Sequence, residues 1–403
     1  MIYLDYAATT PVDKKVLQKM LPFFDKNFAN ASSIHRPGQL AQEAVELAQK
    51  IIAQSLNCQP HEVIFTSGAT ESNNLVFQGI FKALAADSKF KNQKLHFITS
   101  NIEHHCVLDS LAALQKESPQ RIQITYLKVN SQGLINPEKL KKAIQKNTVL
   151  VSIMFVNNEI GSVQPIEKIG RLIASVRKKR NKNNLPLYFH SDAAQAFSYF
   201  DCDTRKLNLD LVTLSAHKIY GPKGVGALAV KTGVRLTPMQ YGGGHQRGLR
   251  SGTLNVSGII GMGEAVNLAQ KQRKDNTQKI TALRDYFIAQ IEKQIPGAKL
   301  NGPRKKRSPN NINFSFAGAE GESIVLLLSQ KGIAVSTGSA CSAESLESSH
   351  VQLAIHPKNH LSAHSSIRFS LGKFTTKQEL ATTVKVLKNV LKKLRKTSKD
   401  IKV

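Results

Sequence analysis

The 403-residue chain has no tryptophan, only four cysteines, and 28 acidic residues against 56 lysines and arginines. The cysteines, at positions 58, 106, 202 and 341, are scattered and form no Cys-x-x-Cys pair, which argues against a disulfide framework or a zinc site. No apolar run approaches the roughly 18 residues of a membrane span. Residues 1–5 also lack the charged and apolar regions of a signal peptide. These absences predict a protein of the reducing cytoplasm that does not enter a membrane.

The shortage of acidic residues leaves a net charge of +28. A field of this size attracts nucleic acids, acidic proteins and small anions. The excess lies in short clusters at 177–180, 304–307 and 392–396, and none of them is interleaved with aromatic residues as a base-stacking surface would be. We therefore expect a generally basic surface without dedicated nucleic-acid binding. A basic nucleic-acid-binding protein is kept as an alternative hypothesis.

What the chain does contain is a regular alternation of apolar strands and helices. The predicted strands lie at 62–66, 96–99, 122–129, 149–155, 187–189, 209–214 and 225–230. Helical patterns separate them, for example at 39–56 and 165–178, where apolar residues recur on one face. Near-continuous apolar strands in this order are typical of a parallel sheet with helices on both faces.

The organisation changes at about residue 256. A long helix to residue 294 leads into a smaller unit that mixes strands and helices. Its strands are predicted at 311–316, 333–335 and 367–370, and its helices at 320–330 and 377–396. This arrangement predicts a second, smaller α+β unit.

Polar residues gather where two of the apolar runs end. Lys218 follows one of them within Ser215-Ala216-His217-Lys218, and Asp192 follows another. A lysine that leaves a core strand is partly desolvated, which lowers its pKa and makes the amine a nucleophile. A lone lysine beside a turn is more often only a solvated residue. The pair, however, is what pyridoxal phosphate requires, because the lysine forms the Schiff base and the carboxylate keeps the pyridine nitrogen protonated.

The segments Ser191-Asp192-Ala193-Ala194-Gln195 and Ser215-Ala216-His217-Lys218-Ile219-Tyr220-Gly221-Pro222-Lys223-Gly224 resemble those of cysteine desulfurases of the NifS and IscS type. The resemblance runs from Tyr3 to about Lys373, and several motifs recur in order. It implies an α/β, aspartate aminotransferase-like fold (fold type I of the enzymes that use pyridoxal 5'-phosphate). Its large domain, 13–255, would hold the mostly parallel sheet, and its small α+β domain would comprise 1–12 and 256–403.

The resemblance also implies a set of cofactor-binding residues. They are Ala69, Thr70, His104, Asn158, Asp192, Gln195, Ser215, His217, Lys218 and Thr253. The first two follow Ser67-Gly68 at the expected start of a helix, which alone is more often a simple helix cap, and would hold the phosphate with Ser215 and His217. His104 would stack on the pyridine ring. Thr253 would bind the phosphate of the other subunit, so a homodimer with shared active sites is expected.

Cys341 differs from an ordinary buried cysteine because small residues surround it in Ser339-Ala340-Cys341-Ser342. Such a segment has little to bury and suits a nucleophile that carries a group elsewhere. By resemblance, Cys341 accepts the sulfur of L-cysteine as a persulfide while the substrate becomes L-alanine. Lys218 and His104 would move protons, and Asn158 and Arg368 would bind the substrate carboxylate.

The implied use of the sulfur is iron–sulfur cluster assembly, through a scaffold or other acceptor protein, with tRNA thiolation as a further use. No resident metal is expected, although a [2Fe–2S] cluster would be ligated transiently through the Cys341 persulfide. Other pyridoxal-phosphate reactions, such as transamination or selenocysteine cleavage, would keep Lys218 and Asp192 but would not need Cys341. The chain also departs from the family at Ala29-Asn30-Ala31 and in its lysine-rich C-terminal tail.

Overall fold

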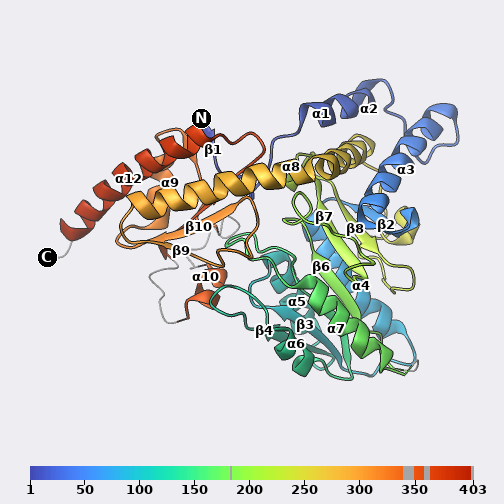
Figure 1. The fold of residues 1–403 in the computed structure, drawn as a ribbon. Helices are drawn as coiled ribbons and strands as arrows, with labels where there is room; N and C mark the ends of the chain where they lie inside the picture. Colours follow the sequence, from blue (N-terminus) through green and yellow to red (C-terminus); the bar gives the residue numbers. More distant parts are fainter. Residues whose placement is uncertain (182–183, 339–348, 358–363, 401–403) are drawn as a thin grey trace.

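The structure is a computed structural model that describes residues 1–181, 184–338, 349–357 and 364–400, the last four as backbone only. Cys341 therefore lies outside the described residues. The described chain forms a large seven-stranded sheet with helices on both faces and a smaller unit with two short sheets (Figure 1). No helix in these ranges is long and apolar enough to cross a membrane.

The seven-stranded sheet has the order β2-β8-β7-β6-β5-β3-β4. Its strands are β2 (Val63–Thr66), β3 (Leu95–Ser100), β4 (Ile122–Leu127), β5 (Thr148–Ser152), β6 (Tyr188–Asp192), β7 (Leu211–Ser215) and β8 (Gly226–Val230). All neighbours pair in parallel except β8, which is antiparallel to both β7 and β2. The predicted mostly parallel sheet is confirmed, and each predicted strand lies within a few residues of the observed one.

Helices cover both faces of this sheet. The helices of this part of the chain are α1 (Lys14–Met20), α2 (Pro22–Asp25), α3 (Arg36–Leu56), α4 (Ala69–Ala86), α5 (His105–Glu117), α6 (Pro137–Ala143) and α7 (Ile166–Lys178), with the short 3-10 helices η1 (Pro60–Glu62), η2 (Ala216–Lys218) and η3 (Gln246–Gly248). Of these, α1 and α2 pack on the long helix that starts at Val256 and not on the sheet. Alternate strand residues point to opposite faces. In β2, Val63 and Phe65 pack in the core that contains residues of α3 and α7, whereas Ile64 packs in the core that contains residues of α4 and α5.

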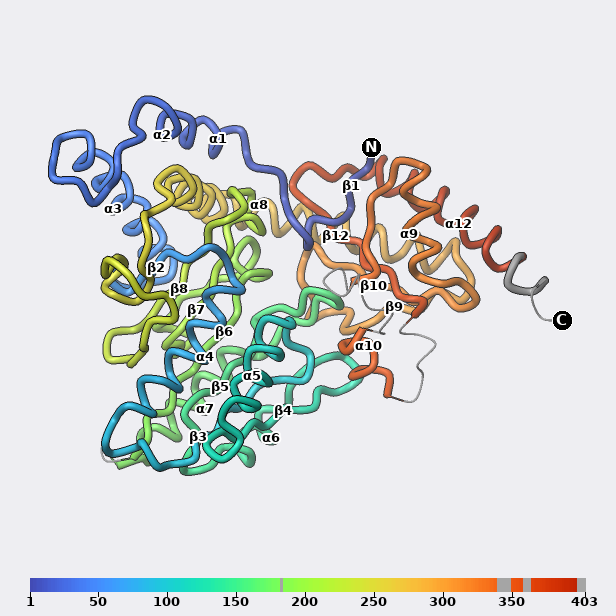
Figure 2. Tube along the Cα trace, turned by 180° about the vertical axis from the view of Figure 1, so that it is seen from behind, coloured from blue at the N-terminus to red at the C-terminus, as the bar shows by residue number. Residues whose placement is uncertain are grey.

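The smaller unit contains β9 (Ala298–Leu300), β10 (Asn311–Phe316) and β12 (Ser366–Ser370) in an antiparallel sheet, and a parallel pair of β1 (Ile2–Tyr3) with β11 (Ile333–Ala334). Its helices are α9 (Gly321–Ser329), α10 (His350–Ile355) and α12 (Lys377–Asp400). The N-terminal strand thus lies with the C-terminal part of the chain, as Figure 2 shows. Sequence patterns did not predict β9 or α10, which are both short.

Helix α8 (Val256–Gln294) spans both units. Near its start Met262 packs in the core with α3, and further along Ile280, Phe287 and Ile291 pack in the core of the smaller unit. The bounds of this helix were predicted correctly. One helix therefore contributes to both cores. The predicted domain boundary between residues 255 and 256 stays a prediction.

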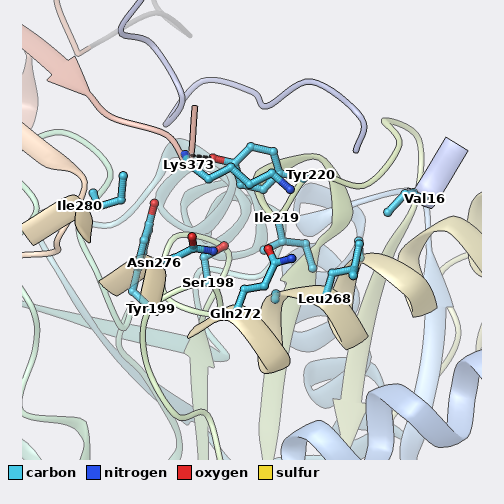
Figure 3. Close-up of a pocket in the computed structure, with 12 residues that line it drawn as sticks. Val16, Ser198, Tyr199, Ile219, Tyr220, Leu268, Gln272, Asn276, Ile280 and Lys373 are labelled. Atoms are coloured by element: carbon cyan, nitrogen blue, oxygen red, sulfur yellow. Dashed lines mark hydrogen bonds between the residues drawn. The ribbon is translucent and has the colours of Figure 1, made fainter. Parts of the chain in front are cut away.

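The two units also meet at Lys373 and Tyr220, which lie side by side in Figure 3. The backbone N–H of Lys373 donates to the Tyr220 hydroxyl at 2.8 Å, and the Lys373 Nζ lies 4.3 Å from the centre of the Tyr220 ring while it pairs with Asp13. The adjoining cavity has a volume of only about 20 Å³, which is room for about one water molecule. This contact joins the loop after β12 to the segment that follows Lys218.

Gly170 in α7 provides a test of how tightly this helix packs. A Cβ at Gly170 would lie 1.9 Å from the carbonyl oxygen of Leu207. Alanine normally stabilises a helix interior by about 1 kcal/mol relative to glycine, but overpacking costs about 1–3 kcal/mol. We expect Gly170→Ala to lower the free energy of unfolding, whereas Ser175→Ala on the exposed side of α7 should change it little. Thermal and urea unfolding measure both, and a stabilised Gly170→Ala variant would contradict this packing.

Candidate active site

A cavity of about 530 Å³ opens at the carboxyl ends of the parallel strands. Ten residues predicted to act in the site line it. They are Ala69, Thr70, His104, Asn158, Asp192, Gln195, Ser215, His217, Lys218 and Arg368. Ligands in open α/β sheets bind at this edge. Of the other two predicted residues, Thr253 is exposed and does not line the cavity, and Cys341 lies outside the described residues.

Lys218 enters the cavity from η2, directly after β7. Its Nζ donates hydrogen bonds of 2.7 Å to the backbone carbonyls of Ala7 and Ala8. Gln195 Nε2 also donates to the Ala7 carbonyl at 2.9 Å, and His217 Nδ1 lies 3.1 Å from the Thr9 hydroxyl. The N-terminal segment therefore forms one wall of the cavity. Residue patterns had not assigned it a place in the site.

Asp192 enters from the end of β6, the strand next to β7. Its carboxylate accepts hydrogen bonds from the backbone N–H of Ala194 at 2.9 Å and from Asn73 Nδ2 at 2.8 Å. The side chain is almost completely buried, and two donors offset the desolvation of its charge. Asn73, on α4, is a further residue of the site that sequence analysis missed. The sequence Glu71-Ser72-Asn73 shows only the pattern of a helix, so it gives no signal for this role.

The N-terminus of α4 faces the same cavity. Its cap residue is Gly68, and no side chain in the described part of the chain caps this helix end, so its first N–H groups are available to an anion. Gly226 lets this turn lie directly against β8, because a Cβ there would be 2.7 Å from Gly68 Cα. The turn is also held by Glu71, which accepts from Ser67 N–H and pairs with Arg250.

His104 is the N-cap of α5 as well as a cavity residue. Its Nδ1 accepts a hydrogen bond from the backbone N–H of Cys106 at 3.2 Å, and it lies 3.1 Å from the Cys106 thiol. Burial lowers the pKa of the imidazole, and the charge of Lys218 lowers it further while Asp192 opposes this effect. The ring is therefore neutral at neutral pH.

Arg368 lies in β12 of the smaller unit and reaches the cavity with a buried side chain. Its Nη1 donates to the Asn158 backbone carbonyl at 3.0 Å, and its Nη2 donates to Asp5 at 2.8 Å. Its Nε has no hydrogen-bond partner among the described residues. The guanidinium is thus held by two elements. These two bonds use two of its five N–H donors, so others remain for an acceptor from outside the chain.

Two acidic residues near the site, Glu103 and Glu159, are buried. Burial raises the pKa of Glu159 to about 7 and that of Glu103 to about 8. Glu159 accepts from the Ser349 hydroxyl and packs against Gly338, so it contacts the described residues on both sides of segment 339–348. Glu103 accepts from Ser100 and from the backbone N–H of Met154. Sequence analysis assigned a role to neither acid.

The described cysteines have strongly raised thiol pKa values. Burial is the main cause and raises the pKa of Cys58, Cys106 and Cys202 to about 12 each. Only Cys106, among these three, lines the cavity. A thiol with such a pKa is protonated at neutral pH and is a poor nucleophile.

Comparison with known proteins is consistent with this geometry. Residues 2–382 match the family model for aminotransferase class-V. The "Cysteine desulfurase IscS" of Dictyoglomus turgidum is 47% identical over 397 residues, which cover 98% of this chain and 96% of that protein.

Solved structures show the same fold. A "NIFS-LIKE PROTEIN" matches with a TM-score of 0.86 and 34% identity, over 97% of this chain and 99% of the other. "SspA in complex with cysteine" matches with a TM-score of 0.77 and 36% identity, over 93% and 100% of the two chains. The chain therefore belongs to the aminotransferase class-V family and, within it, to the cysteine desulfurases of the NifS and IscS type.

Proposed function

We propose that this protein is a pyridoxal-phosphate-dependent cysteine desulfurase that converts L-cysteine to L-alanine and retains the sulfur as a persulfide on Cys341. The observation that carries the proposal is that one cavity contains the amine of Lys218, the carboxylate of Asp192 and the guanidinium of Arg368. Asp192 ends β6, Lys218 follows the end of the neighbouring strand β7, and Arg368 lies within β12 of the smaller unit. Cysteine bound to the relative named above supports the choice of substrate.

The residues present fit pyridoxal phosphate. The uncapped start of α4 at Gly68 offers N–H groups for the phosphate, Asp192 is a buried carboxylate for the ring nitrogen, and Lys218 is an amine for the aldehyde. When bound, this cofactor withdraws electrons from the substrate α-carbon and so makes its proton removable. No other bound group is needed for this assignment.

The side chains would then divide the remaining work. Arg368 would hold the substrate carboxylate through N–H groups that its bonds to Asn158 and Asp5 leave unused. Lys218 Nζ would take the α-proton in its neutral form, and the carbonyls of Ala7 and Ala8 would orient the ammonium that results. The buried, neutral His104 would form part of the cavity wall beside the bound cofactor.

Sulfur transfer would occur without net oxidation or reduction. The Cys341 thiolate attacks the substrate sulfur, the C–S bond breaks, and the released carbon takes a proton, so cysteine and thiol become alanine and persulfide. Gly338 lines the cavity, and three residues of extended chain span about 10 Å. Cys341 is therefore within reach of the cavity, whereas Cys58 and Cys202 do not line it.

The sulfur would pass to an acceptor protein for iron–sulfur cluster assembly, with transfer to tRNA as a further use. We place this activity in the cytoplasm and in a homodimer. Thr253 is exposed and does not line the cavity of its own chain, which supports the proposal that it serves the cavity of a second copy. The net charge of +28 would attract an acidic acceptor at low salt.

Replacing Lys218 by alanine should abolish turnover, by about a thousandfold or more, because the residue would both hold the cofactor and move the proton. Borohydride treatment of the wild type should fix the cofactor to the Lys218 peptide, as peptide mass spectrometry would show. Lys223 also lines the cavity, so Lys223→Ala is the matched control and should retain the label. Label on Lys223 would be incompatible with the assignment.

Cys341→Ala should bind the cofactor normally and lose sulfide and persulfide formation by orders of magnitude, because the remaining thiols are protonated. Mass spectrometry after brief exposure to L-cysteine locates the added sulfur. Cys58→Ala is the control, since this thiol is partly accessible and remote from the cavity. Full turnover by Cys341→Ala, or sulfur on another cysteine, would refute the proposed acceptor.

Mixing Lys218→Ala with Thr253→Ala chains tests the shared site. Each homodimer would carry two damaged sites, but a mixed dimer would have one site with both residues intact and should regain up to half of the wild-type activity per dimer. Activity and sedimentation are measured on the same mixtures. A fully active monomer at every dilution would exclude the arrangement.

A further inference from the structure

The proposed reaction makes no use of the Cys106 thiol, although this thiol lies in the cavity wall. Its Sγ is 3.1 Å from His104 Nδ1 and accepts a hydrogen bond of 3.1 Å from Asn73 Nδ2. The same Asn73 nitrogen donates to Asp192 Oδ2 at 2.8 Å. Asp192, Asn73, Cys106 and His104 therefore form one continuous chain of contacts.

The direction of each hydrogen bond in this chain can be assigned. A carboxylate only accepts, so the amide nitrogen of Asn73, and not its oxygen, must face Asp192. Its Oδ1 is buried and has no hydrogen-bond partner in the described part of the chain. Buried amide oxygens are normally paired. The amide orientation is thus determined by the two acceptors on its nitrogen side, Asp192 and the Cys106 sulfur.

Because Asn73 already donates to the sulfur, the hydrogen of the Cys106 thiol is available for His104 Nδ1. The backbone N–H of Cys106 donates to the same ring nitrogen at 3.2 Å. A nitrogen that accepts two hydrogen bonds carries no proton of its own. The proton of the neutral imidazole must then be on Nε2.

We propose that Asn73 and Cys106 are positioning residues that hold His104 as the Nε2–H tautomer and link this ring to Asp192. The proposal rests on the proposed function only in placing the chain of contacts at a cofactor site. Its consequence is that His104 presents a hydrogen-bond donor, and not a base, through Nε2. Substrate proton removal then falls to Lys218.

Protonation of His104 would break this arrangement, since Nδ1–H would face the backbone N–H of Cys106, and the sulfur would have to accept from it as well as from Asn73. The Cys106 thiol therefore helps to keep the imidazole neutral, as do its burial and the nearby charge of Lys218. Asp192 acts in the opposite direction, and His105 and Asp109 contribute smaller effects of opposite sign. The Thr70 hydroxyl is a further hydrogen-bonding neighbour of the thiol.

The first test is ¹⁵N NMR of the holoenzyme with labelled histidine, with the His104 signals assigned by their loss in His104→Gln. We expect an unprotonated Nδ1 and a protonated Nε2 at neutral pH. This measurement of the two ring nitrogens needs no other variant and no turnover. Its result is therefore independent of whether the protein desulfurates L-cysteine. A protonated Nδ1 in the wild type would overturn the proposal.

The second test follows the protonation of His104 with pH in the same spectra. Cys106→Ala removes one hydrogen bond that only the neutral ring can accept, so the protonation constant should rise about fivefold. Cys106→Ser keeps a donor and should restore the wild-type titration. Cys58→Ala is the matched control, because burial raises the pKa of that thiol equally while it lies far from the cavity. If His104 titrates in Cys106→Ala as it does in the wild type, the proposed role of the Cys106 thiol is refuted.

The link to Asp192 has its own readout, the visible absorbance of the bound cofactor as a function of pH. Asn73→Leu keeps the approximate shape but removes the donor to Asp192, so the absorbance titration should shift. Asn74→Ala changes the next residue, whose side chain donates to the Thr70 carbonyl and does not line the cavity, and it should leave the titration in place. If the cofactor absorbance of Asn73→Leu and of the wild type changes with pH in the same way, the proposed link between Asn73 and Asp192 is overturned.

Discussion

The parallel pairing of β6 with β7 is the constraint on which the site depends. Asp192 pairs in register with Thr213, so the two chains leave the sheet side by side. The η2 turn then places Lys218 over the same edge, next to the end of β6. Both strands are completely buried, which prevents them from sliding without exposing apolar side chains. Core packing thereby fixes the separation of an amine and a carboxylate that the chemistry requires.

The second constraint is that the smaller unit completes a cavity that begins in the larger one. Arg368 comes from β12, and Ala7 and Ala8 come from a segment that also bonds to β12 through the Ser370 hydroxyl. Helix α8 and the Lys373–Tyr220 contact tie these elements to the large sheet. Arg368, the proposed substrate clamp, and Lys218, the proposed reactive lysine, thus come from elements with different cores. Their relative position depends on that junction being rigid.

Much of this organisation was visible in the sequence. The strands of the large sheet, the bounds of α8 and the residues at strand ends follow from apolar runs and from polar residues placed directly after them. Asn73 was not found, because a polar residue inside a helical pattern looks like part of a solvated face. Ala7 and Ala8 could not be found either, since they act through backbone carbonyls that any residue would supply. Glu103 and Glu159 were missed because sequence does not reveal burial of a single acid.

The need for a thiolate explains why the sulfur acceptor should come from outside the cavity wall. The same burial that keeps His104 neutral raises the pKa of Cys106 to about 12. A wall thiol there is a hydrogen-bond donor and cannot also be an anionic nucleophile at neutral pH. A site that excludes water around the ring must therefore receive its thiolate from a segment with access to solvent. Gly338 and Ser349, both in contact with Glu159, flank residues 339–348, which include Cys341 and lie outside the described residues. Burial thus argues against Cys106 as the thiolate, and it supports the proposals that Cys106 positions the His104 ring and that Cys341 carries the sulfur.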